Sequence, residues 1–395
     1  MKRIAMAAAT LLACVATPAA AQNRMWHADG QRVVDGQGRP VTMRGVNVGN
    51  WLMWEGYMFG GALAGSESVM MERLAQTIGT ENARRFRRNV QDAYLTEADV
   101  ALMARAGFNT IRLPINYRSL VTDKGCLACD GQGWRHIDRL LGWARSHGLK
   151  VILDLHAAPG AQSSLPIADT TIGRKAFWSS AVDQARAVSL WGEIARRYAG
   201  NDAVAGYDVL NEPQAPSADA LRAFYREAIG AIRAVDRDHM IWLEGNQLSS
   251  DLTVFDRGLG PNIGYSTHVY TFPVDRRQQR FAAAAALSQR LDAPMWIGEF
   301  GISDRTLAGT VAMMRRPGIA GWSYWSWKYV AKDAAPCDLA PPKAWTDIAP
   351  WLSGGVLRRR PEAAAVERGT AALVSYLRAY RCQPDTAVLR ALSPG

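Results

Sequence analysis

Three glutamates follow short apolar runs of the kind that form buried strands. They are Glu212 in an N-E-P motif, Glu244 after I-W-L, and Glu299 in a G-E-F motif. Two carboxylates that face each other across a cleft can cut a glycosidic bond, because one attacks the anomeric carbon while the other protonates the leaving oxygen. The spacing along the chain does not decide which two of the three form such a pair.

Other polar or aromatic side chains also stand where apolar runs end. They are Arg112, His156, Asn211, His268, Tyr270 and Trp325. Each has a structural explanation when taken alone, such as a salt bridge for Arg112 or packing for Trp325. A purely structural fold gives no reason for strand after strand to end in such a group. Together they predict a substrate-binding site around the glutamates, in which the Asn211 amide holds a sugar hydroxyl.

Eight apolar runs must position these side chains, and helical patterns such as 137–147, 221–235 and 363–377 separate them. The runs span 44–47, 109–113, 150–155, 206–210, 241–243, 263–266, 295–297 and 321–324. Repeated βα units with right-handed crossovers close naturally at eight strands, and barrel enzymes place polar residues at the carboxyl ends of those strands. We therefore predict an α/β fold, a single (β/α)8 TIM barrel. A doubly wound sheet is the rival, but residues 45–49 are a poor match to its phosphate loop.

The region before the first run predicts two further features. Residues 32–34 and 41–43 flank a turn at 35–38, which indicates an N-terminal β-hairpin. Residues 1–21 carry a basic start, an apolar stretch and an A-x-A site, which predicts a cleaved signal peptide. A lipid on Cys14 is the alternative. No linker interrupts residues 22–395, so we expect one catalytic domain, exported to the periplasm or the medium.

The cysteines that remain after cleavage predict disulfides. Of the 5 cysteines, Cys14 leaves with the signal peptide, and an even number in an oxidising compartment favours pairing. We expect a local Cys126–Cys129 bridge and a Cys337–Cys382 bridge, because Cys382 follows the last predicted helix, which should pack beside the last strand. A zinc site with four thiolates is the alternative, although only one C-x-x-C occurs.

The N-E-P motif at Glu212 and the I-G-E-F-G motif at Glu299 make the sequence resemble glycoside hydrolase family 5, the cellulase-like clan of retaining β-glycosidases. The resemblance extends over residues 44–325 and beyond. It implies that Glu212 is the acid/base and Glu299 the nucleophile, while Glu244 matches no catalytic position. Residues 156–162 resemble exo-β-glucanase and β-glucosidase members of the family more than plain endocellulases. The six polar and aromatic residues named above match the family's supporting positions.

The resemblance also implies roles for the supporting residues. Arg112 is expected to keep Glu299 ionised and Tyr270 to orient it by a hydrogen bond. The charge of Glu299 is expected to raise the pKa of Glu212, so that Glu212 stays protonated until the leaving group departs. Trp325 is expected to form a platform under the sugar. Residues 55–95 are expected to form a loop and helix over the cleft.

Four further tryptophans stand near strand ends with Trp325, and we expect about half of the five to belong to the core rather than to the cleft, because alternate strand residues face opposite sides. They are Trp51, Trp54, Trp322 and Trp327.

Composition and motifs argue against a nucleic-acid-binding protein, a membrane protein and a metal-dependent hydrolase. The formal charge is +10, or +8 without Lys2 and Arg3. The dense arginine clusters are those at 84–88 and 358–360, and the arginines at 84–88 sit in a helical pattern that favours a solvated face, so no nucleic-acid partner is expected. No apolar stretch after residue 22 is long enough for a membrane span. A metal-dependent hydrolase using Asp154, His156 and His268 is a rival, but the 6 histidines include no H-x-H or H-E-x-x-H motif, so we expect neither metal nor cofactor.

The function that these observations favour is retaining hydrolysis of β-linked glucosides or β-glucans by a monomeric enzyme. The alternatives are another β-glycoside on the same barrel (a mannan, a glycolipid or an aryl glycoside) and a carbohydrate-binding protein without catalysis.

Overall fold

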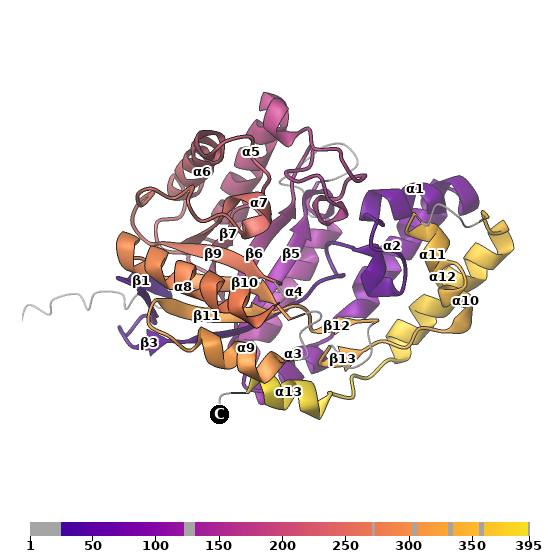
Figure 1. Cartoon of the computed structure of the whole chain (residues 1–395). Coiled ribbons are helices and arrows are strands. Elements are labelled where there is room, and N and C mark those ends of the chain that lie inside the picture. The colour runs from indigo at the N-terminus through magenta and orange to yellow at the C-terminus, as the bar shows by residue number, and fades with distance from the viewer. Residues whose placement is uncertain are drawn as a thin grey trace, which may run out of the picture.

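The computed structural model describes residues 25–121, 131–270, 273–301, 306–330, 335–354 and 359–393, so the predicted signal peptide and Cys126–Cys129 bridge lie outside the described residues. Eight parallel strands close into a barrel in the order β10-β11-β4-β5-β6-β7-β8-β9 (Figure 1). They are β4 (Met43–Asn47), β5 (Thr110–Asn116), β6 (Lys150–Ala157), β7 (Val204–Asp208), β8 (Met240–Glu244), β9 (Ile263–Val269), β10 (Met295–Phe300) and β11 (Ile319–Tyr324). Each predicted run overlaps one of them, and the TIM barrel is confirmed.

Parallel pairing brings the strand ends together in a fixed register. Asn47 pairs with Arg112 across β4 and β5, and Glu299 pairs with His268 across β10 and β9. Every residue of β5, β7, β8, β9 and β10 is buried, as expected for strands that are covered by the barrel interior on one side and by helices on the other. The carboxyl ends of the strands therefore gather polar side chains in a dry environment.

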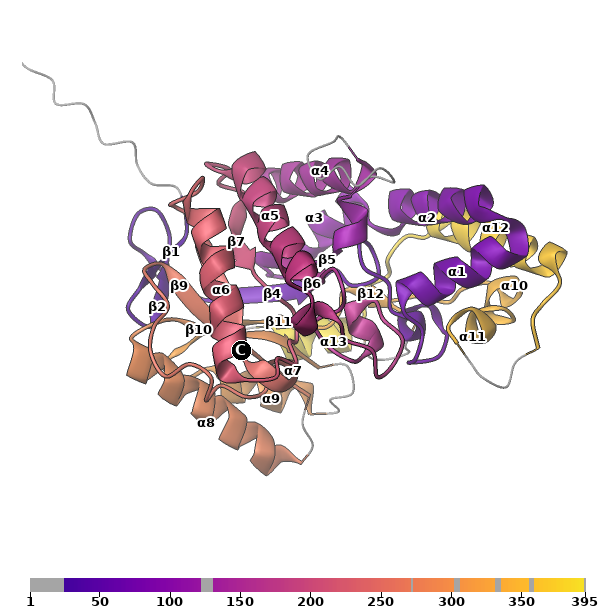
Figure 2. The same cartoon turned by 90° about the horizontal axis from the view of Figure 1, so that it is seen from above.

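Helices follow most of the strands and cover the outside of the barrel (Figure 2). They are α3 (Glu97–Arg105), α4 (Gln132–Ser146), α5 (Ala181–Tyr198), α6 (Ala218–Arg233), α8 (Val274–Leu291) and α9 (Leu307–Met314). Local sequence sets where several begin: Thr96 and Asp99 form a capping box on α3, and Ser180 and Ser217 cap α5 and α6. Between β8 and β9 the chain makes only the short α7 (Asn246–Ser249).

Single 3-10 turns occur in the loops that connect these elements. They are η1 (Gly56–Phe59), η2 (Tyr117–Ser119), η3 (Pro166–Ala168) and η4 (Phe177–Ser179).

A small antiparallel sheet covers the amino-terminal end of the barrel. It contains β1 (His27–Asp29), β2 (Arg32–Val34) and β3 (Pro40–Val41), so the predicted hairpin is present and gains a third strand. Met43, which the sequence placed in the hairpin, begins β4 instead. Trp26 and Val33 pack against barrel residues that include Met43, and this contact closes the barrel at that end.

Two segments that are far apart in the sequence form a helical lobe beside the barrel (Figures 1 and 2). Its members are α1 (Glu67–Ile78), α2 (Thr80–Tyr94), α10 (Lys343–Thr346), α11 (Ala349–Leu352) and α12 (Ala363–Ala379). Aromatic contacts hold it together, since Phe86 lies against Trp345 and Trp54 with ring centroids 5.7 and 5.9 Å apart. The predicted cover over the cleft is thus only partly correct, because residues 67–94 pack against α12 and only the start of the segment reaches the cavity described below.

The predicted Cys337–Cys382 disulfide is present, with a Cα–Cα distance of 5.3 Å. The expected reason for it was wrong. Helix α12 packs against α2 in the lobe rather than beside the last strand, and a further helix, α13 (Thr386–Leu392), follows Cys382 and packs against α9. On the other side of the bridge, β13 (Cys337–Asp338) pairs with β12 (Lys328–Tyr329), so the disulfide ties the chain that follows Trp325 to the carboxyl-terminal segment.

No helix among the described residues combines the length and the apolar character needed to cross a bilayer.

Candidate active site

Arg112 on β5 occupies the centre of the polar cluster at the carboxyl ends of the strands. It is fully buried, and Nη1 donates to Glu299 Oε1 (2.5 Å) while Nη2 donates to Glu244 Oε1 (3.0 Å). Nε donates to Asp208 Oδ2 (2.8 Å), and Nη2 also lies 3.0 Å from Asp154 Oδ2. Burial disfavours its charge, but these four carboxylates raise its pKa well above the usual value. Arg112 therefore remains a cation that orients several acids at once.

Glu299 on β10 is held from two sides. Arg112 binds Oε1, and the Tyr270 hydroxyl donates to Oε2 at 2.7 Å. The residue is 5 % exposed, so one edge of the carboxylate reaches the cavity while the rest is fixed by the protein. Two donors on the two oxygens fix the direction in which a lone pair points, which is what a nucleophilic carboxylate requires.

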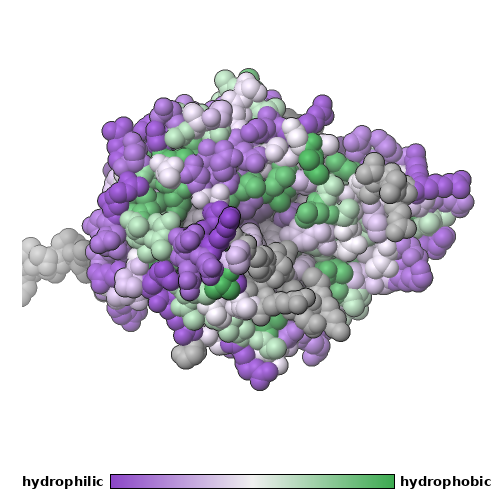
Figure 3. Space-filling view, in the orientation of Figure 1, coloured by the Kyte–Doolittle hydropathy of each residue, from purple (hydrophilic) through white to green (hydrophobic). Residues whose placement is uncertain are grey.

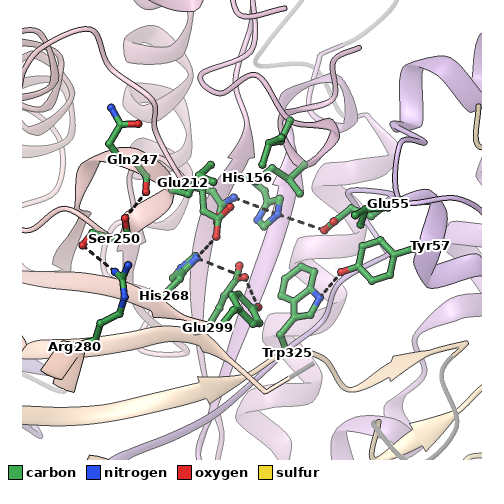
Figure 4. Close-up of a pocket in the computed structure, with 16 residues that line it drawn as sticks. Glu55, Tyr57, His156, Glu212, Gln247, Ser250, His268, Arg280, Glu299 and Trp325 are labelled. Carbon is green, nitrogen blue, oxygen red and sulfur yellow. Dashed lines mark hydrogen bonds and ion pairs between the residues drawn. The ribbon is translucent and has the colours of Figure 1, made fainter. Parts of the chain in front are cut away.

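Glu212 lies four residues beyond the end of β7 and has a left-handed backbone (φ 45°). Its Oε1 lies 2.8 Å from His268 Nδ1, and one oxygen of Glu212, one of Glu299 and a His268 ring nitrogen all lie within 4.8 Å of one another (Figure 4). Burial raises the pKa of Glu212 to about 7; His268 opposes this rise, whereas the charges of Glu299 and Glu244 add to it. The predicted influence of Glu299 is thus present, although burial is the larger cause.

Glu244 at the end of β8 is completely buried and does not line the cavity. Its Oε2 accepts the backbone N–H of Glu212 (2.7 Å), and its Oε1 lies 3.2 Å from His268 Nε2. Burial works against its ionisation, but His268 and Arg112 outweigh burial and lower the pKa of Glu244 to about 2. Glu244 is therefore a buried anion that binds the Glu212 backbone and His268 outside the cavity.

His268 on β9 bridges the acids. It contacts Glu212 through Nδ1 and Glu244 through Nε2, and although burial opposes a charge on the ring, Glu244 and Glu299 raise its pKa well above the usual value. Gly298 makes room for this ring, because a Cβ at that position would lie 2.9 Å from His268 Nε2. The first glycine of the I-G-E-F-G motif, Gly298, is therefore explained by close packing in the barrel.

The floor of the site is formed by His156 and Trp325, whose rings stack 5.5 Å apart at 13°. Asp154 binds His156 Nδ1 at 2.7 Å, and Trp325 Nε1 donates to the Tyr57 hydroxyl at 2.9 Å. Burial disfavours a charged His156, but Asp154 and other acids raise its pKa to about 10. Asn211 Nδ2 lies 3.4 Å from His156 Nε2, and Asn211 Oδ1 accepts from Arg112 Nη2 at 2.8 Å.

A cavity of about 560 Å³ opens over this cluster. Five of the six residues predicted to bind substrate line it together with Glu212 and Glu299, namely His156, Asn211, His268, Tyr270 and Trp325. Arg112 does not line the cavity, but it donates a hydrogen bond to Glu299, which does. Of the five tryptophans predicted near strand ends, Trp325 alone lines the cavity, and the other four are buried in the apolar core. The expectation that about half would be core was therefore too low, because the strand-end positions also pack against the surrounding helices.

Several lining residues were not predicted from the sequence. Glu55 and Tyr57 come from the start of the 55–95 segment, and Gln247 and Arg280 come from α7 and α8. Glu55 lies 3.7 Å from His156, and burial raises its pKa. Its position just beyond the N-W-L-M-W stretch after the first strand was the available signal, since the other candidates follow strands in the same way.

The rival metal site is not assembled. Asp154 pairs with His156, and His268 contacts Glu212 and Glu244. Asp154, His156 and His268 do not form one of the groups of described residues whose ligand atoms all lie within 4.8 Å of one another. Glu212, His268 and Glu299 are the pocket residues whose ligand atoms lie close enough to share an ion. Their two carboxylates and one histidine are the same groups that the acid/base and nucleophile chemistry requires.

Known proteins resemble this chain over most of its length. Residues 72–331 match the family described as Cellulase (glycosyl hydrolase family 5). A β-xylosidase from Phanerodontia chrysosporium is 32% identical over 289 residues, which are 69% of this chain and 60% of that protein. A probable glucan 1,3-beta-glucosidase A from Emericella nidulans is 34% identical over 199 residues, 48% of each chain. The chain thus spans between about half and three-fifths of the length of these relatives.

Among solved structures, the rutinosidase from Aspergillus niger superposes with a TM-score of 0.60 at 16% identity and covers 75% of this chain and 92% of that chain. At this identity the likeness shows a common fold. With the barrel, the strand-end residues and the family match in agreement, the chain belongs to glycosyl hydrolase family 5.

Proposed function

We propose that this protein hydrolyses β-linked glucosides or β-glucans with retention of configuration, by a double displacement that uses Glu299 and Glu212. The observation that carries the proposal is that carboxylate oxygens of the two residues lie within 4.8 Å. Retaining enzymes place the two carboxyl groups about 5–5.5 Å apart, whereas inverting enzymes need about 6.5–9.5 Å to admit a water. Membership of the family supports the same mechanism.

In the first step, Glu299 attacks the anomeric carbon and forms a glycosyl ester while Glu212 donates its proton to the leaving oxygen. A pKa of about 7 keeps most of Glu212 protonated in mildly acidic solution and about half of it protonated in neutral solution. Once the ester forms, the negative charge of Glu299 is gone, and Glu212 releases a proton more readily. It then acts as the base that activates the water for the second step.

The surrounding residues divide into two groups in this mechanism. His156, Asn211, His268, Tyr270 and Trp325 line the cavity and contact the substrate. Arg112 is a positioning residue, because it is fully buried and reaches the reaction only through Glu299 and its other carboxylate partners.

The Cys337–Cys382 disulfide supports a location outside the cytoplasm, and the family match over residues 72–331 supports one catalytic domain. We propose that residues 1–21 direct export, that residues 22–395 form one catalytic domain, and that the enzyme works as a monomer outside the cytoplasm. N-terminal sequencing of the secreted protein checks the first, limited proteolysis the second, and light scattering after size-exclusion chromatography the third. Two stable fragments of about half the mass would contradict the single domain.

The mechanism is tested by following the anomer that is released. Proton NMR during hydrolysis of an aryl β-glucoside is expected to show the β-anomer first, and first appearance of the α-anomer would overturn the proposal. The relative named as a β-xylosidase makes β-xylosides the second candidate substrate. A panel of aryl β-glucosides, aryl β-xylosides and β-1,3-, β-1,4- and β-1,6-linked glucans separates the two and reveals the preferred linkage.

A further inference from the structure

The cavity changes character between its floor and its mouth. On the floor, Glu55, His156, Asn211 and Trp325 are each at most 4 % exposed, and they offer hydrogen-bonding groups beside one aromatic face. These are the groups that a sugar ring with its hydroxyls requires. A sugar whose anomeric carbon lies between Glu212 and Glu299 can use these partners at the floor, and its leaving oxygen lies on the side of Glu212, which protonates it.

The mouth carries aliphatic side chains. Hydrophobic side chains border the hollow in the middle of the face shown in Figure 3, and four aliphatic residues line the cavity. They are Leu63, Leu165, Ile167 and Leu248. Leu63 is 73 % exposed although it lines the cavity, so it presents an apolar side chain to solvent at the entrance. Leucine and isoleucine have no group that can bond a sugar hydroxyl, so they are poor partners for a second sugar.

Polar side chains are also present at the mouth, but they are partly engaged with the protein. Arg280 Nη1 donates to the carbonyl of Ser250 (3.1 Å), and Ser250 Oγ donates to the carbonyl of Gln247 (2.6 Å), as the dashed lines in Figure 4 show. These contacts connect α8 to the chain after α7. They give the mouth a fixed polar edge on one side of the aliphatic residues.

Leu248 is held in place by an unusual backbone. Gln247, Leu248 and Ser249 all have left-handed φ angles of 50°, 59° and 58°, a conformation that residues with a side chain disfavour. Hydrogen bonds lock this turn to the chain just beyond Glu212, since Leu248 N donates to the carbonyl of Pro213 (3.2 Å), and Asn246 exchanges two bonds with Ala215. Backbone strain of this kind persists where the surrounding structure demands it, and here it directs a leucine into the cavity beside the acid/base.

We propose that this mouth is a subsite for an aliphatic leaving group, so that the preferred substrates are β-glycosides of alkyl alcohols rather than chains of sugars. The inference rests on the proposed function. The occupant follows from continuity, because the aliphatic residues line the same cavity as the two glutamates. Leu248 is in addition hydrogen-bonded to the chain just beyond Glu212, the residue that protonates the leaving oxygen.

The test compares methyl, butyl and octyl β-D-glucopyranosides below the concentration at which micelles form, with cellobiose and laminaribiose as sugar-leaving references. The alkyl alcohols have similar leaving-group acidity, so a trend in kcat/KM reports binding of the chain in the transition state. Each methylene fully removed from water is worth about fourfold, so even partial burial is expected to raise kcat/KM at least ~10-fold from methyl to octyl. A parallel series of β-D-xylopyranosides covers the second candidate sugar.

Leu248→Asn is the informative variant, because asparagine tolerates a left-handed backbone better than leucine and removes the apolar side chain without new strain. We expect the octyl-to-methyl ratio of kcat/KM to fall at least ~3-fold, the loss of about one buried methylene. Val182→Asn is the matched control, since Val182 is 61 % exposed on α5 and does not line the cavity. It should leave the ratio unchanged.

A flat alkyl series, or disaccharides cleaved better than octyl glycosides, would overturn the subsite while leaving retaining hydrolysis intact. An unchanged ratio in a folded Leu248→Asn protein would do the same. No turnover of any glycoside in either sugar series would instead reject the proposed function and the subsite with it.

Discussion

The backbone N–H of Glu212 donates a 2.7 Å hydrogen bond to Glu244 Oε2, so the side chain of Glu244 fixes the main chain of Glu212. Glu212 has a left-handed backbone with φ 45°, which non-glycine residues disfavour, and this bond helps to keep it there. Glu244 also contacts His268, which touches the Glu212 carboxylate. An acid that never reaches the cavity thus orients both the backbone and the side-chain partner of the proposed acid/base.

Replacing Glu244 should therefore cost stability first. Glu244→Ala removes one buried carboxylate partner from both Arg112 and His268, and breaking a buried pair typically costs about 3–5 kcal/mol. Glu244→Gln keeps an acceptor for the Glu212 N–H and should lose less. Denaturant unfolding of both variants measures the difference, and added azide should not restore activity to either. Azide rescue of Glu244→Ala would show that Glu244, and not Glu212, is the acid/base.

The two proposed catalytic glutamates should respond differently to the leaving group. Glu299→Ala should abolish turnover, because no glycosyl ester can form. Glu212→Ala should lose about 10²–10⁴-fold on substrates with poor leaving groups, the usual contribution of general acid catalysis. A dinitrophenyl glycoside needs little protonation, so its first step should survive and an ester on Glu299 should accumulate. Equal proportional losses on both substrate classes would contradict the assignment.

Azide distinguishes the two faces of the sugar. In Glu212→Ala it should attack the accumulated ester without base assistance and give a β-glycosyl azide, which retains configuration. In Glu299→Ala it should attack the substrate directly and give the α-azide. NMR of the isolated products checks both outcomes, and the opposite pattern would exchange the two roles.

The pH profile should report Glu212. Its pKa is raised to about 7, mainly by burial, and the first step needs the protonated form. We therefore expect kcat/KM for an alkyl or oligosaccharide substrate to fall tenfold per pH unit well above pH 7. The fall should be weaker for a dinitrophenyl glycoside, which does not need the proton. An alkaline limb of the same steepness for both would assign it to another group.

The Cys337–Cys382 disulfide should stabilise the native protein. It joins residues 45 positions apart, and the chain-entropy model assigns such a loop about 3–4 kcal/mol. Reduction, or the Cys337→Ser change, should lower the denaturation midpoint accordingly, with the oxidised protein as the control. Peptide mapping without reductant should recover the 337–382 pair, and Cys337 joined to Cys126 or Cys129 would refute it.

Strand positions and the identity of the strand-end residues were predictable because both depend on local signals. The apolar runs from 44–47 to 321–324 each fall on a barrel strand, since strands buried on both sides leave continuous apolar stretches in the sequence. The polar residues that follow them then had to meet at one end of the barrel. His156, Asn211, His268, Tyr270 and Trp325 do meet there, around one cavity.

The path of the carboxyl-terminal helix was not predictable in the same way. The pattern at 363–377 correctly indicates a helix, but nothing in that pattern says whether its apolar face meets the barrel or the helices α1 and α2. Packing partners depend on complementary shape over long sequence separations. The disulfide was therefore predicted correctly for a reason that the structure does not support.

The sequence by itself determined the barrel and the set of polar groups at its carboxyl end, because an apolar run and the polar residue that ends it are recognisable from adjacent residues. Only the tertiary structure decided which charges meet. Arg112 and Glu299 are 187 residues apart in the sequence. The same guanidinium also binds Glu244, which is buried behind the cavity and does not line it. Pairings of this kind, and the aliphatic mouth formed by residues from separate loops, depend on how far side chains project into a shared space, a distance that no local pattern encodes.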